Sequence, residues 1–204
     1  MTEPFQVVSG VAAALLMPNI DTDTIIPKQF LKGIDRSGLR DGFLFDLRFN
    51  AFGKPRSEFI LNRPEWAEAR FLIVGPNFGC GSSREHAVWA LQQLGVRALI
   101  GTSYGSIFRD NCLRNGVLAV SLHEHEVAEL AEQAGHPSEN WLTIDLPAQT
   151  VTPRHSGRSI RFDIESLPKR ALETGSDAVS STMRLADKIR SFEVEHHAAF
   201  PWLA

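Results

Sequence analysis

The stretch GCGSSREHA, residues 79–87, gathers several chemically useful side chains in one loop. Gly79 and Gly81 let backbone N–H groups turn inward, because no Cβ stands in the way. A loop that opens a helix also presents free N–H donors at the positive end of the helix dipole. Arg84 adds a guanidinium that can bind a carboxylate or a phosphate through two hydrogen bonds. The stretch therefore predicts an anion-binding pocket with a hydroxyl group inside it.

A purely structural interpretation of this loop competes with the functional one. Ser82 and Glu85 fit the capping box S-x-x-E, in which the serine caps a helix and the glutamate reaches back to it. Such a cap contributes about 1 kcal/mol to stability. It needs only one serine, however, and it leaves the second serine and Arg84 unexplained.

Common loop motifs do not fit the stretch. It has no lysine for a phosphate-binding P-loop, and Arg84 stands where the dinucleotide fingerprint needs glycine or alanine. The nucleophile elbow G-x-S-x-G fails around both serines. Cys80 and His86 could form a thiol nucleophile and its base, but a small buried cysteine is the commoner outcome.

The elements that must position this loop form a repeating pattern. Residues 69–75 are an apolar run typical of a buried strand, and residues 84–95 have apolar side chains at helical spacing that end at a glycine. A strand, a helix and a third strand follow at 96–103, 106–116 and 117–122. This order predicts a parallel α/β layer covered by helices.

The flanking segments extend this layer. We expect a strand and turn near residues 7–18, a polar loop at 19–27, and a strand or helix at 43–49. A helix at 124–135 is followed by paired strands at 140–153 and 159–165, joined around RHSGR. The chain from about residue 167 is predicted to be a helical extension with a solvated, charged face, and the whole of 1–204 to be a single domain.

Composition excludes several classes of function. The 204 residues are 43% hydrophobic and 22% charged, with a formal net charge of −3 and scattered basic residues, which does not favour nucleic acid or an anionic membrane. The N-terminus shows no signal peptide, and no apolar run is long enough to cross a bilayer. Two cysteines cannot form a disulfide framework, so we expect a cytoplasmic protein.

Three stretches together resemble a known family. NIDTDTIIP, GCGSSREHA and SIFRDNCLRNG stand in the same order, at similar spacing, in the swivelling domain of the aconitase superfamily. The resemblance extends from about residue 5 to 200, and within the superfamily the chain is most similar to the small subunits of 3-isopropylmalate dehydratase. The resemblance implies an α/β fold of the swivelling β/β/α three-layer type. It also implies a hydro-lyase of leucine biosynthesis, which converts 2-isopropylmalate to 3-isopropylmalate through isopropylmaleate.

The same resemblance implies roles for the loop residues. Ser82 matches the residue that, as an alkoxide, takes the proton from carbon, while Ser83 and Arg84 match residues that bind the substrate carboxylate and stabilise the alkoxide. A serine hydroxyl is a weak base, so its deprotonated form needs concentrated positive potential, which helix N–H groups and a guanidinium supply. Gly79, Gly81, Glu85 and His86 are then loop-shaping residues.

Other positions receive roles from the likeness with open alternatives. Arg36 is a second candidate for binding the substrate carboxylate, with a solvated surface arginine as the alternative. Phe30, Leu31 and Lys32 lie where the family contacts the substrate side chain, and the apolar pair suits an isopropyl group. Asp21 and Asp23 look like a metal pair but have no further ligand nearby, so we interpret them as residues that fasten the turn and the loop. His123 and His125 are expected on the surface.

The resemblance also implies a partner. In the family a [4Fe–4S] cluster is bound by the cysteines of a separate large subunit, and a cluster takes three or four thiolates. Cys80 and Cys112 cannot hold one, so we expect no metal or cofactor on this chain and a heterodimer with an iron–sulfur large subunit, without which the chain is inactive. Its partners would otherwise be a small dicarboxylate, with no nucleic acid and no membrane.

One region departs from the expected pattern. The stretch 173–189 lacks the hydrophobic residues that we expect near the end of the family, which leaves the exact substrate open. A related branched hydroxy diacid of the citramalate or dimethylmalate type is one alternative. A non-catalytic module that only binds an anion is the other.

Overall fold

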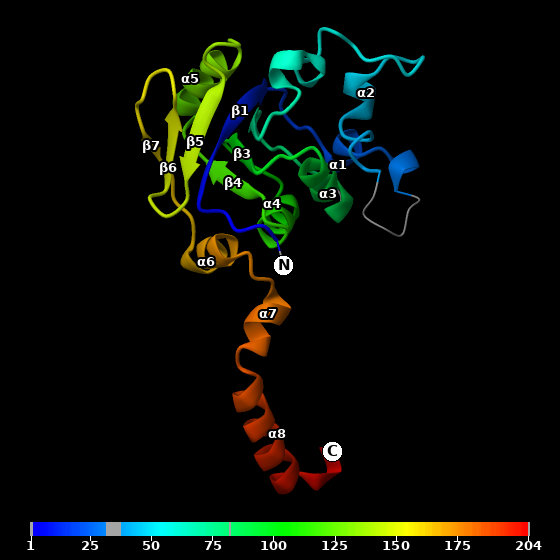
Figure 1. The fold of residues 1–204 in the computed structure, drawn as a ribbon. Helices are drawn as coiled ribbons and strands as arrows, with labels where there is room; N and C mark the ends of the chain where they lie inside the picture. Colours follow the sequence, from blue (N-terminus) through cyan, green and yellow to red (C-terminus); the bar gives the residue numbers. More distant parts are fainter. Residues whose placement is uncertain (1, 32–37, 82, 204) are drawn as a thin grey trace.

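The computed structural model describes residues 2–31, 38–81 and 83–203, and within them it shows a mixed α/β fold (Figure 1). The strands form one sheet in the order β4-β3-β2-β1-β5-β6-β7. They are β1 (Val7–Leu15), β2 (Phe71–Val74), β3 (Ala98–Gly101), β4 (Leu118–Ser121), β5 (Trp141–Asp145), β6 (Thr150–Pro153) and β7 (Ile160–Arg161). The helices are α1 (Thr22–Ile25), α2 (Phe45–Arg48), α3 (Glu85–Gln93), α4 (Ser106–Arg114), α5 (Glu124–Ala134), α6 (Ser166–Thr174), α7 (Ala178–Met183) and α8 (Ala186–Ala199).

Strands β1 to β4 form a parallel half-sheet. In its register Ala13 lies beside Leu72, and Ile73 lies beside Ile100. All four residues of β2 and of β3 are buried, because helices or other strands cover both faces of the parallel layer. The alternating strands and helices predicted for residues 69–122 are therefore confirmed.

Strands β5 to β7 form the antiparallel half. Residues 140–153, which the sequence predicts as one strand of a pair, instead contain the two strands of the β5–β6 hairpin. The turn between them is fastened by the Ala148 N–H, which donates to the Asp145 carboxylate, and Gln149 takes a positive φ. Strand β1 pairs with β2 on one side and β5 on the other, so it joins the two halves.

Two hydrophobic clusters lie on the two faces of the sheet. One contains Leu72, Val74 and Leu99 with buried residues of α3 and α4. The other contains Phe71 and Ile73 with buried residues of α5, of the antiparallel strands and of α6. Because both halves of the sheet contribute to the second cluster, the sheet curls around α5. This arrangement confirms the predicted α/β fold of the swivelling-domain type.

One short segment differs from the expected local structure, and another adopts one of its two expected alternatives. The stretch 19–27, predicted as a loop, contains the single-turn helix α1, whose start is capped by Asp21. The stretch 43–49, for which the sequence allows a strand or a helix, contains the short helix α2. A local side-chain contact stabilises α1: the Asp21 carboxylate accepts a hydrogen bond from the Thr24 N–H at 2.7 Å.

Within the described residues, no helix has the length and apolar character required to cross a membrane.

Candidate functional site

The candidate loop follows β2 at the carboxyl edge of the parallel strands and is held by the loops that follow its two neighbours. The Gly79 N–H donates to the Ile20 carbonyl at 2.7 Å, and the Thr22 N–H donates to the Cys80 carbonyl at 3.0 Å. On the other side the Gly105 N–H donates to the Phe78 carbonyl at 2.9 Å. These bonds continue the order of the sheet beyond its strands, so the loop has a fixed backbone on both sides.

Gly79 and Gly81 both adopt a backbone conformation that favours glycine. Their φ angles are +73° and +88°, a region that side chains other than glycine rarely adopt. A Cβ on Gly79 would also lie 2.2 Å from ring atoms of Phe108, so the loop packs directly on α4. Phe78 also packs against Phe108, with ring centroids 5.6 Å apart, and so adds to the contact between the loop and α4.

The start of α3 differs from the predicted capping box. Arg84 is the N-cap, Glu85 is the first helical residue, and no side chain caps the turn in the described part of the chain. The Glu85 carboxylate accepts a hydrogen bond from Asn115 Nδ2 at 2.8 Å. With Arg84 as the N-cap, Glu85 does not stand at the third helical position that a capping box requires, and its predicted partner Ser82 lies outside the described residues.

Arg84 is fixed by an acid on the neighbouring loop. Its Nη1 forms an ion pair with Asp23 Oδ1, and the Arg84 side chain is 16% exposed while that of Asp23 is 51% exposed. The nearby Asp21 has a pKa below its usual value, chiefly because of its hydrogen bonds with Thr24, and Arg84 adds a favourable charge. Asp21 thus fastens the turn as expected, whereas Asp23 holds the guanidinium.

Sequence reasoning missed this second role. The signal was present in the spacing: Asp21 is in place to cap α1, which leaves Asp23 one half-turn further along with no local task. Only the approach of the two loops across the sheet edge shows that Arg84 is its partner.

The other candidate residues lie in several different surroundings. Ser83 is exposed beside Arg84, and His86 packs against Trp89 with ring centroids 4.6 Å apart. The rings of Phe30 and Phe45 have centroids 5.1 Å apart, and both Phe30 and Leu31 are half-buried against the first hydrophobic cluster. Three candidates lie outside the described residues: Ser82, Lys32 and Arg36.

The two cysteines occupy different environments. Cys112 is buried within α4, and burial raises the pKa of its thiol. Cys80 is half-buried, and its Sγ lies 3.6 Å from the Asn19 carbonyl oxygen. The described residues contain no cluster of three or more histidine, cysteine or acidic side chains that could hold a metal ion. His123 and His125 are exposed, as expected, and their rings stack.

A cavity of about 560 Å³ lies at the same edge of the sheet but outside the loop. Its lining residues come from the ends of β1, β2, β3 and β4 and from α5, and they are Leu16, Val74, Gly75, Pro76, Thr102, Leu122, His123, Glu124, Val127 and Ala128. Neither Ser83 nor Arg84 lines it. This cavity is therefore separate from Ser83 and Arg84.

Comparison with known proteins gives a consistent result. The family described as Aconitase C-terminal domain matches residues 2–125, and the family of C-terminal domains of the 3-isopropylmalate dehydratase small subunit matches residues 180–204. The second match includes residues 180–189, so that part of the stretch expected to depart from the family lies within it.

Full-length relatives and a solved structure agree. The chain is 50% identical over 201 residues to 3-isopropylmalate dehydratase small subunit 1 of Mannheimia succiniciproducens, covering 98% of each chain. It is 52% identical to small subunit 2 of Salmonella choleraesuis, covering 98% of this chain and 96% of the relative. The crystal structure of 3-isopropylmalate dehydratase from Methanocaldococcus jannaschii superposes with a TM-score of 0.66 at 24% identity, over 92% of this chain and 99% of that one. The chain belongs to the family of 3-isopropylmalate dehydratase small subunits.

Proposed function

We propose that the chain is the small subunit of a hydro-lyase that isomerises 2-isopropylmalate to 3-isopropylmalate through isopropylmaleate. One observation carries the proposal. A guanidinium, Arg84, is held by Asp23 at the N-cap of α3, directly beside the two serines of the loop. This arrangement is built for an anion, and the chain belongs to a family of hydro-lyase subunits.

The proposed chemistry uses the loop in two ways. Ser82 is the general base: its deprotonated oxygen takes the proton from one substrate carbon as the hydroxyl group leaves the neighbouring carbon as water. In the addition it gives a proton to that neighbouring carbon, while water adds its oxygen to the first. The positive end of α3 and the Arg84 guanidinium stabilise that negative oxygen. A positioned general base contributes about 10²–10⁴ in rate.

Ser83 and Arg84 bind a substrate carboxylate in this proposal. A guanidinium has five N–H donors in a planar fork, so the ion pair of one nitrogen with Asp23 fixes its plane without using the whole fork. Ser83 is exposed next to it and can add a hydroxyl donor. Asp23 therefore orients the group that recognises the substrate.

The substrate side chain would be recognised by the segment that follows α1 and its continuation. Phe30 and Leu31 form an apolar, half-buried surface, which suits an isopropyl group better than a third carboxylate. Lys32 follows them, and Arg36 would supply a second contact to a carboxylate. Gly79, Gly81, Glu85 and His86 keep the loop in place.

The rest of the site would come from an iron–sulfur large subunit in a heterodimer. Two cysteines, one buried in α4, do not provide the three or four thiolates of a cluster, so this chain has no fitting site for one. On the partner the [4Fe–4S] cluster supplies Lewis acidity toward the substrate hydroxyl and carboxylate. We place the enzyme in the reducing cytoplasm and the whole chain in one domain with a helical extension from about residue 167.

The test is reconstitution of the full-length chain with its iron–sulfur large subunit. We expect the complex to convert 2-isopropylmalate and the chain alone to be inactive. Ser82→Ala should lower kcat by about 10²-fold or more. Ser57→Ala changes an exposed serine that lies before β2 in the chain, and it should leave kcat unchanged. Near wild-type turnover by Ser82→Ala would remove the proposed base.

The same assay separates the alternatives. Turnover of a citramalate or a dimethylmalate in place of 2-isopropylmalate would keep the chemistry and change the substrate. Binding of a dicarboxylate without turnover of any of these acids, in a complex that contains its cluster, would favour a module that only binds anions.

A further inference from the structure

The end of the chain, residues 178–203, is here called the arm. It consists of α7, α8 and a short 3-10 turn at Pro201–Leu203. In Figure 1 the arm extends away from the rest of the molecule as the orange and red end of the ribbon. None of the residues of α8 is buried, so the helix has no hydrophobic core of its own to stabilise it.

The arm nevertheless carries an apolar stripe. Leu185, Ile189, Phe192, His196 and Phe200 follow one another at intervals of three or four residues and so share one face of α8. Rings along this face pack in series, with centroids 5.2 Å apart for Phe192 and His196 and 5.0 Å apart for His196 and Phe200. Trp202 continues the series at 5.5 Å from Phe200. The stripe is therefore preorganised rather than a set of scattered apolar residues.

The exposed area of the arm is large for a protein that works alone. Phe192 is 64% exposed and Trp202 is 75% exposed. The exposed large apolar side chains of the arm are Val179, Met183, Leu185, Ile189, Phe192, Val194, Phe200, Trp202 and Leu203. Together they expose roughly 1,000 Å², which matches the ~800 Å² that each partner contributes to a standard interface and exceeds the few hundred Å² usual for an apolar patch on a monomer.

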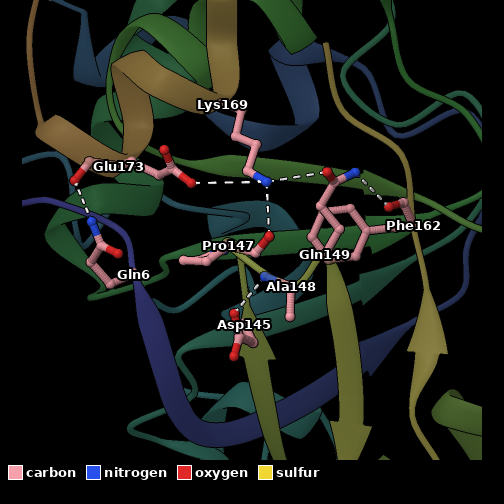
Figure 2. Close-up of polar contacts among 8 residues, drawn as sticks. All are labelled: Gln6, Asp145, Pro147, Ala148, Gln149, Phe162, Lys169 and Glu173. Carbon is pink, nitrogen blue, oxygen red and sulfur yellow. Dashed lines mark hydrogen bonds and ion pairs between the residues drawn. The ribbon is translucent and has the colours of Figure 1, made fainter. Parts of the chain in front are cut away.

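The root of the arm is firmly attached. Figure 2 shows Lys169 of α6, whose Nζ donates to the Pro147 carbonyl at 2.8 Å and to Gln149 Oε1 at 3.2 Å. Gln6 Nε2 donates to the Glu173 carbonyl at 2.9 Å, which ties the same helix to the N-terminal segment. Helix α6, which precedes the arm, is thus bound to both the β5–β6 turn and the segment before β1.

A cavity of about 930 Å³ continues the apolar surface at this root. It lies between α4, α6 and α7, and its apolar lining includes Leu113, Leu167 and Val179. Helix α4 begins at the carboxyl edge of the sheet and ends, near Leu113, at the opposite edge. The arm projects from this end of the molecule (Figure 1), whereas the end of α4 itself lies within reach of Glu85, the residue after Arg84, through Asn115.

We propose that the arm is a docking element for the large subunit of the hydro-lyase, outside the catalytic cleft; this inference rests on the proposed function. A cleft shared by two subunits must open for substrate to enter, so a contact elsewhere is needed to keep the subunits together. A second, tethered contact raises the effective concentration of the first. The segment that matches the C-terminal family of small subunits, residues 180–204, is the same segment that projects. The partner surface would be an apolar groove that accepts Phe192 and Trp202.

The test measures binding of the full-length chain to the purified iron–sulfur large subunit. Phe192→Ser and Trp202→Ser should each raise the dissociation constant at least tenfold, since aromatic side chains often contribute most of the binding energy of an interface. When the small subunit is saturating, kcat should stay within about twofold of wild type, because the arm is remote from the loop. Val194→Ser is the matched control: Val194 is 71% exposed on α8 but lies off the stripe, and this change should leave binding intact.

Two results would overturn the docking proposal. One is equal binding by Phe192→Ser, Trp202→Ser and Val194→Ser. The other is a chain that sediments alone as a dimer and becomes monomeric with Phe192→Ser, which would make a second copy the occupant. Failure of the proposed function is a separate outcome: the wild-type complex then forms and loses affinity with Phe192→Ser but does not turn over 2-isopropylmalate.

Discussion

The guanidinium of Arg84 and the carboxylate of Asp23 form an ion pair between two loops at the carboxyl edge of the sheet. Arg84 begins α3, while Asp23 lies within α1, and the backbone bond of Cys80 with Thr22 brings the two loops together. The pair fixes the direction of a side chain that would otherwise have many rotamers. Its removal, and the removal of neighbouring contacts, should have measurable effects on catalysis and stability.

Asp23→Asn should leave the fold intact and weaken catalysis by the reconstituted complex. The neutral amide holds the guanidinium less firmly, and a misplaced substrate-binding group can cost about 10²-fold. We expect kcat/KM for 2-isopropylmalate to fall by about 10- to 100-fold, with most of the change in KM. Asp163→Asn, an exposed acid beside β7, serves as the control and should have no effect. An unchanged KM in Asp23→Asn would show that the ion pair does not position Arg84.

Gly79→Ala should destabilise the protein more than Gly53→Ala does. Both glycines have φ near +72°, so both substitutions carry about 1–2 kcal/mol of backbone strain. Around Gly53 there is open space, whereas a Cβ on Gly79 meets Phe108. We expect Gly79→Ala to lower the free energy of unfolding by about 1–3 kcal/mol more than Gly53→Ala, as measured by urea denaturation. Equal losses would mean that the loop is not packed on α4.

Asn115→Ala should weaken the connection between α3 and α4. Asn115 is buried, its Nδ2 donates to Glu85, and its Oδ1 accepts a hydrogen bond from Trp89 Nε1 at 3.2 Å. Removing the amide takes a partner from both groups, and we expect the free energy of unfolding to fall by about 2–3 kcal/mol. Glu85→Gln keeps an acceptor oxygen and should cost less than about 1 kcal/mol. A loss in Asn115→Ala no larger than that in Glu85→Gln would contradict this role.

The stabilising effect of Asp21 should depend on pH. The pKa of Asp21 in the folded protein lies below its ordinary value of 3.8, so its contribution is fully present above that value and is lost as the pH falls through the lower, folded pKa. At pH 7 Asp21→Ala should lower the free energy of unfolding by about 1 kcal/mol, and this difference should shrink as the pH falls below 3.8. Asp21→Asn keeps a capping oxygen without a charge, so any contribution that it retains should not vary over this range. A pH-independent loss in Asp21→Ala would rule out the ionised cap.

Local sequence patterns were sufficient to predict the central layer of the protein. The apolar run that forms β2, the helical spacing that forms α3 and the glycines that follow α3 and α4 are local patterns, because burial and backbone conformation follow from nearby residues. They also placed the glycine-rich loop between β2 and α3. The position of GCGSSREHA in the fold could therefore be predicted from the sequence, while its chemistry stays a prediction.

Contacts between distant segments determine which side chains meet. Glu85 contacts Asn115 instead of capping its own helix, Asp23 meets Arg84, and residues 140–153 fold back as the β5–β6 hairpin. Each outcome depends on the approach of segments distant in the chain, which short-range periodicity does not encode. The same holds for the arm: its sequence predicts a charged helical extension, but only the arrangement in space shows that the stripe around Phe192 is left uncovered.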